Sequence, residues 1–267
     1  MTPRAKDDGR VRLHPRFSSR YLSTPRDIAV YVPPGYDAAE ARYPVLYLQD
    51  GQNLFDAATA FAGNEWRADA IADDEIRRGC VEPLIIVGIY NAGVRRISEY
   101  TPTRDRRSRK GGKAERYGQM LAREVKPLID QTYRTRKGPY DTGVGGSSLG
   151  ALVSLVAGLR YPRVFGKFAL MSPSVWWDEH SILSLIDAWK PAGSRCVWLD
   201  TGTAEGSNPA KVVADARLMR DALAAKGMTL HYEEAPGHEH NEGAWSARFG
   251  AVLEYLFPAR GRGAARG

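Results

Sequence analysis

The sequence predicts an α/β fold in which a mostly parallel central sheet is covered by helices on both faces. Short apolar segments of strand length alternate with longer segments whose apolar residues recur at helical spacing. Segments 43–50 and 84–89 are almost continuously apolar, which is typical of strands buried on both faces. The chain has 267 residues, of which 43% are hydrophobic and 26% charged, and this suits one globular domain with a large core.

The first half of the chain begins with short strands. The alternating segment 26–33 is the first longer strand, and it ends at the turn formed by Pro33, Pro34 and Gly35. Pro127 lies inside a helical pattern, where it is expected to kink the helix. The predicted strands are 11–13, 17–22, 26–33, 43–50 and 84–89, and the predicted helices are 65–78 and 115–133.

The second half alternates regularly. Pro162 ends one helical pattern, and Pro209 suits the first turn of another. The predicted strands are 140–145, 168–172, 196–200 and 230–234, and the predicted helices are 149–161, 181–189, 209–225 and 242–257. Because no repeat or linker divides this pattern, we expect one domain over 1–258, with an N-terminal β extension over 1–24. A disordered Gly/Arg tail is expected over 259–267.

The positive charge of the chain is concentrated in two places. The net charge is +7 and the isoelectric point is about 9.4. Segment 104–116 contains seven Arg and Lys residues, and the C-terminal tail contains three Arg residues. The ordinary interpretation is a solvated loop and a disordered tail, while the sharper one is attraction of an anionic substrate or surface. We expect no nucleic-acid partner, and the sequence does not predict the oligomeric state.

Cysteine usage and the N-terminus suggest a compartment. Cys80 and Cys196 lie far apart beside apolar segments, so we expect buried free thiols, which fits a reducing environment. Residues 1–10 lack the apolar core of a signal peptide, and no apolar run is long enough to span a membrane. The expected location is the cytoplasm, with no membrane partner.

The most informative motif is Gly-x-Ser-x-Gly over residues 146–150, with Ser148 at its centre. It stands between a predicted strand and a predicted helix, which is the context of a nucleophile elbow. Glycines are needed there because a tight strand–turn–helix connection leaves no room for side chains, and the helix N-terminus favours a developing oxyanion. The ordinary interpretation is a Gly-rich turn with a helix-capping Ser.

A serine nucleophile needs a base, which is usually a histidine. His238 and His240 lie between the last predicted strand and the last predicted helix, where a catalytic histidine belongs in such a sheet. Spacing alone does not choose between them. His14, His180 and His231 are interpreted as structural. Because no Cys or third nearby His completes a zinc set, we expect no metal.

The orienting acid is expected after the strand 196–200. Glu205 is the first choice because it lies in the loop proper, and Asp200 at the strand end is the alternative. Two backbone N–H groups should stabilise the oxyanion. We expect one from Leu149, which follows the nucleophile. The other is expected from Gln52, with Asn53 as the next choice, after the strand 43–50, where Gly51 permits close backbone approach.

Taken together, these residues resemble the putative-esterase branch of the α/β-hydrolases, which includes enterochelin esterases, esterase D and feruloyl esterases. The resemblance covers residues 25–257. It is carried in order by 32–36 (VPPGY), 46–55 (LYLQDGQNLF), 96–102 (RISEYTP), 145–150 (GGSSLG), 172–177 (SPSVWW) and 240–245 (HNEGAW). It implies an α/β-hydrolase fold and an enzyme that needs no cofactor.

The resemblance also implies site residues. The family places its histidine a few residues before a Trp at the start of the last helix, which favours His240, ahead of Trp245, over His238. Its acid follows a Gly-Thr turn, which favours Glu205, although some siderophore esterases of the group use a Ser–His dyad. The Asp-Gly-Gln turn at 50–52 departs from the His-Gly form of other hydrolases, but a backbone donor does not depend on that side chain.

The expected function is therefore hydrolysis of a small-molecule carboxylic ester through an acyl-enzyme, with an aromatic or anionic acyl group such as that of a siderophore. Candidate substrate contacts are Asn53, Arg96, Trp176 and Trp177. The alternatives are an S-formylglutathione-type thioesterase, a sugar acetyl or feruloyl esterase, and an acyltransferase. A non-catalytic binder of polyanions or nucleic acid on a hydrolase scaffold is the alternative of another class.

Overall fold

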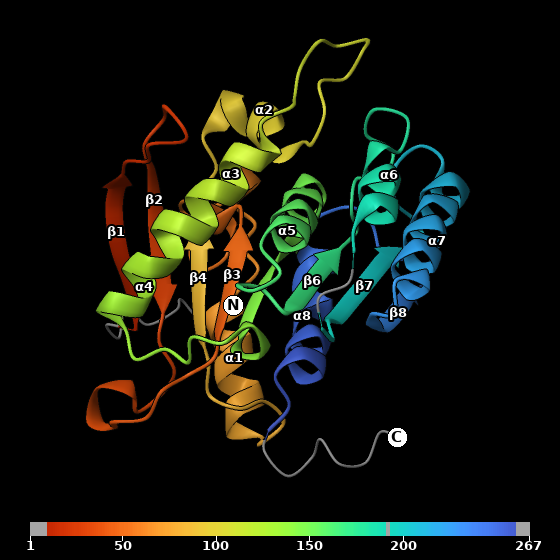
Figure 1. Cartoon of the computed structure of the whole chain (residues 1–267). Helices are drawn as coiled ribbons and strands as arrows, with labels where there is room; N and C mark the ends of the chain where they lie inside the picture. The colour runs from red at the N-terminus through yellow and green to blue at the C-terminus, as the bar shows by residue number, and fades with distance from the viewer. Residues whose placement is uncertain (1–9, 191–192, 260–267) are drawn as a thin grey trace.

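The computed structural model describes residues 10–190 and 193–259, and it is organised around one eight-stranded sheet (Figure 1). The strand order is β1-β2-β4-β3-β5-β6-β7-β8. The strands are β1 (Val11–Phe17), β2 (Arg26–Tyr31), β3 (Val45–Gln49), β4 (Ile85–Ile89), β5 (Thr142–Ser147), β6 (Lys167–Met171), β7 (Cys196–Gly202) and β8 (Thr229–Ala235). Strands β3 to β8 are mutually parallel, whereas β2 pairs antiparallel with β4, and β1 with β2.

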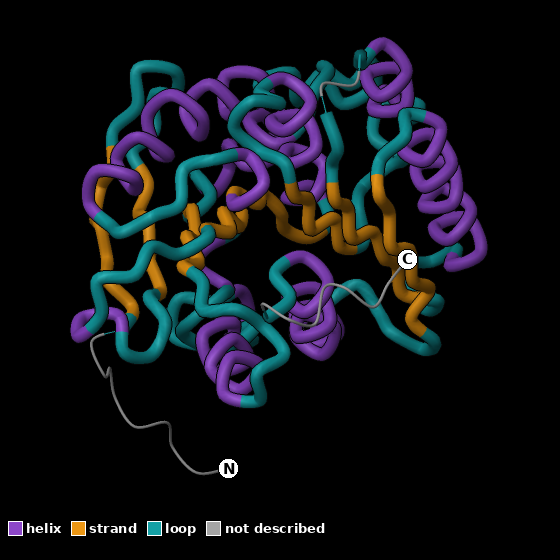
Figure 2. Tube along the Cα trace, turned by 60° about the horizontal axis from the view of Figure 1, so that its bottom comes forward, coloured by secondary structure: helices purple, strands orange, loops and turns teal. Residues whose placement is uncertain are grey.

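Helices lie on both faces of this sheet (Figure 2). They are α1 (Ala68–Arg77), α2 (Arg96–Tyr100), α3 (Ala114–Met120), α4 (Lys126–Thr132), α5 (Leu149–Arg160), α6 (Ser181–Ala188), α7 (Pro209–Ala225) and α8 (Glu242–Leu256). One apolar core packs the sheet against α3 to α7, and a second packs the opposite face against α1 and α8. The predicted α/β fold is thus confirmed.

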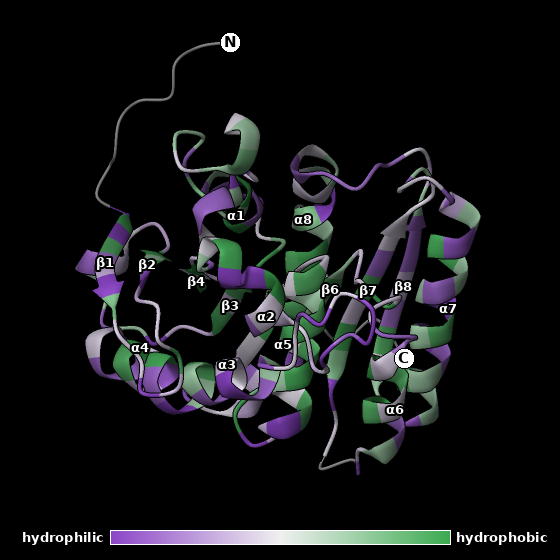
Figure 3. Cartoon of the chain, turned by 90° about the horizontal axis from the view of Figure 1, so that it is seen from above, coloured by the Kyte–Doolittle hydropathy of each residue, from purple (hydrophilic) through white to green (hydrophobic). Residues whose placement is uncertain are grey.

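The helices differ in how much of their surface is apolar, and this matches their position. In α5 all residues except Arg160 are buried, because this helix lies under its neighbours at the middle of the sheet. Helix α7 covers the edge of the sheet, and Figure 3 shows apolar and polar residues side by side along it. An amphipathic helix of this kind buries one face and leaves the other to solvent.

The helix predicted over 115–133 contains a π-helical turn. Helix α3 passes into a π-helix over Leu121–Val125 and then into α4. Pro127 is the second residue of α4. Proline has no N–H and its ring clashes with the carbonyl of residue i−4, so the widened turn accommodates Pro127 without ending the helix.

Two predictions about irregular segments are corrected. The predicted strand 17–22 is wrong: the pairing of β1 with β2 ends at Phe17 after a bulge that begins at His14, and the N–H of Arg20 donates to Glu124 Oε1 at 3.1 Å instead. Helix α2 was not predicted, because only five residues form it.

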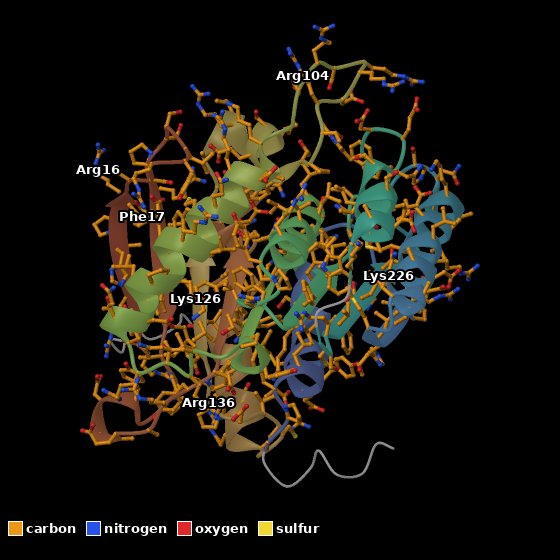
Figure 4. The ribbon with its side chains drawn as sticks, in the orientation of Figure 1. Arg16, Phe17, Arg104, Lys126, Arg136 and Lys226 are labelled. Atoms are coloured by element: carbon orange, nitrogen blue, oxygen red, sulfur yellow. The ribbon has the colours of Figure 1, made fainter. Side chains whose placement is uncertain are left out.

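The basic segment between α2 and α3 forms the loop that rises above the rest of the molecule in Figure 1, and Figure 4 labels Arg104 at its start. Arg104 and Gly111 form an isolated β-bridge that closes the loop. Cys80 and Cys196 form no disulfide with each other; Cys80 is buried and Cys196 is half-buried. In the described part of the chain no helix is long and apolar enough to cross a membrane. Residues 260–267 of the predicted Gly/Arg tail lie outside the described residues.

Candidate active site

Ser148 stands on a sharp turn between β5 and α5. Its backbone has φ 57° and ψ −124°. This conformation is strained for any residue other than glycine. The turn packs directly against the end of β3: a Cβ on Gly146 would lie 3.2 Å from Gln49 Cβ, and one on Gly150 would lie 3.2 Å from Asp50 Oδ2. A side chain at either glycine would therefore press on the residues at the end of β3.

The Ser148 hydroxyl has one hydrogen-bond partner among the described residues, the hydroxyl of Ser174, at 3.1 Å between the oxygens. Ser174 is buried, and its N–H donates to the carbonyl of Ser148 at 3.2 Å. The structure thus does not join Ser148 to His240 by a direct hydrogen bond.

His240 and Glu205 are brought together from two different loops, after β8 and β7. His240 Nδ1 lies 2.7 Å from Glu205 Oε2, and the His240 ring meets Trp245 edge-on at 5.0 Å between centroids. Burial raises the pKa of Glu205, but hydrogen bonds from His240, the Ser172 hydroxyl and the Gly202 N–H outweigh burial and hold this pKa below its ordinary value. Glu205 is therefore an ionised carboxylate aimed at one nitrogen of His240.

Asp200, the alternative acid, has different partners. It is completely buried, and it accepts hydrogen bonds from Arg248 Nη2 at 3.0 Å and Trp198 Nε1 at 2.8 Å. Burial raises its pKa despite the charge of Arg248. The other histidine, His238, accepts at Nδ1 a hydrogen bond of 2.9 Å from Arg248 Nη1. Asp200 and His238 thus both hydrogen-bond to Arg248, and in the described part of the chain neither has a hydrogen bond to Ser148.

Ser172 joins this network to Glu205, and the sequence analysis gave it no role. Its hydroxyl donates to Glu205 Oε1 at 2.5 Å and accepts from Trp245 Nε1 at 3.0 Å and Arg248 Nη2 at 3.1 Å. One donor and two lone pairs are all that a hydroxyl offers, so every position is used. Two sequence signals pointed to it: its place after a predicted strand, and its position at the start of segment 172–177, which carries part of the family resemblance.

The two expected oxyanion donors are available. Leu149 is the first residue of α5, and Gln52 lies in a 3-10 turn over Gly51–Asn53. Within residues 10–190 and 193–259, neither backbone N–H donates to a protein acceptor. The expected close approach at Gly51 is present, because a Cβ there would lie 2.3 Å from the carbonyl carbon of Gly88.

Arg96, an expected substrate contact, is engaged by a carboxylate. Its Nε and Nη2 donate to the two oxygens of Asp50, each at 2.7 Å, and its guanidinium lies 5.1 Å from the centre of the Tyr100 ring. Asp50 is buried, has φ 57°, and immediately precedes the turn that holds Gln52. The pair therefore fixes the start of this turn, and the charge of Arg96 is already neutralised.

The other expected substrate contacts differ in exposure. Asn53 is buried, accepts from the N–H of Phe61 at 3.0 Å and donates to Glu242 Oε1 at 3.2 Å. Trp177 is buried and donates to the carbonyl of Thr103, whereas 55% of Trp176 is exposed. Of these side chains, Trp176 is the one that offers a broad free surface.

Among the described residues, one group has potential metal ligands close together, namely Glu75, Cys80 and Glu254. This group shares no residue with the site around Ser148, Glu205 and His240.

The chain is similar in sequence and in fold to several known proteins. The chain is 26% identical to the uncharacterized protein YbbA of Bacillus subtilis over 90% of this chain and 95% of that protein. It is 26% identical to the ferri-bacillibactin esterase BesA of the same organism over 75% of this chain and 74% of the relative. The enterobactin esterase FES from Shigella flexneri has the same fold, with a TM-score of 0.75 at 19% identity, covering 92% of this chain and 58% of that one.

A family model gives the strongest result. The model described as "Putative esterase" matches residues 19–256, which is nearly the whole described chain. This range includes the turn at Ser148, the loop with Glu205 and the loop with His240. The family and its esterase relatives support an ester hydrolase. The chain belongs to the putative esterase family.

Proposed function

We propose that this protein hydrolyses carboxylic esters through an acyl-enzyme formed on Ser148. The observation that carries the proposal is the 2.7 Å contact between His240 Nδ1 and an ionised Glu205, in a chain whose Ser148 occupies a strained strand–turn–helix position. A buried carboxylate bound to one ring nitrogen fixes the tautomer, which leaves Nε2 as the base.

In the proposed reaction, Ser148 Oγ attacks the ester carbonyl carbon while His240 Nε2 takes the hydroxyl proton. The same nitrogen then gives the proton to the departing alcohol oxygen, and the acyl group stays on Ser148. Water then attacks the acyl carbon while His240 Nε2 takes its proton. The bond between the acyl carbon and Ser148 Oγ breaks, Nε2 returns the proton to Oγ, and the acid is released. Ser148 begins this sequence by exchanging its hydrogen bond with Ser174 for one with His240.

The negative charge that develops on the carbonyl oxygen would be stabilised by the N–H groups of Leu149 and Gln52. Support for this role comes from the absence of a protein acceptor for either N–H in the described chain. The Asp50–Arg96 pair holds the start of the Gln52 turn, so we assign Arg96 a positioning role. Preorganised donors of this kind each lower the barrier by about 3–4 kcal/mol.

For the substrate we propose esters with an aromatic acyl group, of which siderophore esters are the leading class. Trp176 offers an exposed aromatic surface, packed on Trp177 at 5.9 Å between ring centroids, on the loop that follows Ser174. The relative BesA is a ferri-bacillibactin esterase, and FES was solved with enterobactin. Thioesters and feruloyl or acetyl sugar esters are the competing classes.

The test combines a fluorophosphonate probe with a substrate panel. We expect the probe to label wild-type protein and not Ser148→Ala, and the Ser174→Ala variant to remain labelled. A panel of aromatic, short aliphatic and thioester substrates then ranks the acyl groups by kcat/KM. Labelling of Ser148→Ala, or turnover at the wild-type rate by that variant, would contradict the proposal.

A further inference from the structure

A cavity lies between the β1–β2 connection, α2 and the start of α3, and its volume is about 280 Å³. Its lining includes Ser19 and the charged residues Arg20, Arg95, Glu99, Lys113 and Arg116. None of these residues belongs to the proposed ester-hydrolysing site. The cavity is therefore separate in its residues from the chemistry proposed for Ser148.

The charged residues of this cavity do not balance. Glu99 is neutralised by Arg26 at 2.8 Å, with both side chains buried, and Arg20 is neutralised by Glu124 at 3.1 Å. Among the described residues, no carboxylate lies within ion-pair distance of the remaining cations, which are Arg95, Lys113 and Arg116. The cavity thus carries three uncompensated positive charges.

The walls of the cavity are held in place by hydrogen bonds. Glu124 binds the connection after β1, because it accepts from the Ser19 hydroxyl at 2.5 Å and from the N–H of Arg20 at 3.1 Å. On the other side, the N–H of Lys113 donates to the carbonyl of Ser98 in α2 at 3.0 Å. These contacts hold the backbone of the cavity walls, and the wall formed by residues 95–116 presents the unpaired cations.

We propose that this cavity binds the oligophosphate group of a small molecule. Two guanidinium groups and one ammonium group suit an oxyanion with several negative charges, because Arg forms bidentate hydrogen bonds with phosphate and Lys adds a point charge. A pyrophosphate group fits a volume of about 280 Å³, whereas a nucleic-acid strand needs an extended groove. The site is a second, non-catalytic binding site of this chain.

The test is titration calorimetry of the whole chain with pyrophosphate, with sulfate as a divalent comparison. The pocket variant is Lys113→Gln with Arg116→Gln. The matched control is Arg106→Gln with Arg107→Gln, which removes the same charge from exposed residues of the projecting loop that do not line the cavity. We expect one pyrophosphate per wild-type chain, and binding about tenfold or more weaker in the pocket variant.

The control variant should bind as the wild type does, and sulfate should bind more weakly than pyrophosphate. An equal loss in both double variants would mean a diffuse electrostatic effect and would overturn the proposal, as would an absence of binding by the wild type. Circular dichroism verifies that each variant is folded, and Arg95→Gln alone provides an independent pocket variant. Ser148→Ala should bind pyrophosphate normally, so this result does not depend on the ester chemistry.

Discussion

Replacing Ser172 by Ala tests whether the buried network around Glu205 is built as described. The change removes a hydroxyl that donates to Glu205 Oε1 and accepts from Trp245 Nε1 and Arg248 Nη2. Arg248 keeps its bond to Asp200, but Trp245 loses the one acceptor that its indole has among the described residues. The variant thus loses bonds to two charged groups, Glu205 and Arg248, and orphans one buried donor, Trp245 Nε1. Because Arg248 Nη2 keeps Asp200 as an acceptor, the bond to Glu205 and the orphaned donor are the two losses that count.

The magnitude follows from these two losses. A hydrogen bond to a charged group contributes about 1.5–3 kcal/mol, and a buried unsatisfied donor costs about 1–3 kcal/mol. The expected loss in the free energy of unfolding is about 4 kcal/mol, and since each kcal/mol lowers Tm by about 2–4 °C in a chain of this size, Tm should fall by about 8–16 °C. Ester hydrolysis should fall as well, because the variant holds Glu205 less firmly.

Urea unfolding of the variant beside wild type and Ser154→Ala provides the assay. Ser154 is also completely buried, but its hydroxyl donates only to the carbonyl of Gly145 at 3.0 Å. That control should lose about 1 kcal/mol, because it removes one neutral bond and leaves no donor without an acceptor. If Ser172→Ala were as stable as Ser154→Ala, the described network would not contribute to stability, and the reasoning would be refuted.

Three further predictions concern the proposed site. The free energy of unfolding, measured in urea, should be about 1 kcal/mol higher for Ser148→Gly than for Ser148→Ala, because glycine adopts φ 57° without strain. Equal stability would argue against strain at this turn. The pKa of Glu205 is lowered in the fold from an ordinary value of 4.5, so its contribution is complete above this value and is lost as pH falls through the native pKa. The stability difference between wild type and Glu205→Gln should accordingly shrink in urea titrations below about pH 4.5. A difference that grew as the pH fell would mean that folding raises the pKa of Glu205, which contradicts the prediction. Gly51→Ala should reduce both stability, by about 1–3 kcal/mol, and esterase activity, because its Cβ would displace the Gly88 backbone and with it the adjacent turn; unchanged kcat would exclude this turn from the oxyanion hole.

Much of the fold was predictable because the sequence pattern is local. Continuous apolar segments marked the buried strands, and helical spacing together with Pro162 and Pro209 placed the helices that cover them. The errors lie where long-range contacts decide the backbone. The segment after Phe17 leaves the sheet because Glu124, more than 100 residues later, binds it, and no local pattern reveals such a contact.

The site was predictable to the same extent. The Gly-x-Ser-x-Gly turn and the loops after β7 and β8 could be found by position, because parallel strands end at one edge of the sheet. The partners of individual side chains could not. Nothing in the sequence separates a free Arg96 from one paired with Asp50, or shows that Ser172 saturates its hydroxyl, since both depend on side chains that meet only after folding.

The irregular end of β1 has a consequence for how the sheet meets other molecules. A strand at the edge of a sheet exposes unpaired backbone groups that can recruit a foreign strand and start aggregation. Here the exposed edge includes Pro15, which has no N–H to offer, followed by Arg16 with φ 53° and a bulge that bends the strand. A strand from another molecule could form only a few backbone hydrogen bonds with β1 before the proline and the bulge interrupted the pairing. The shape of this edge therefore disfavours aggregation through strand addition at β1.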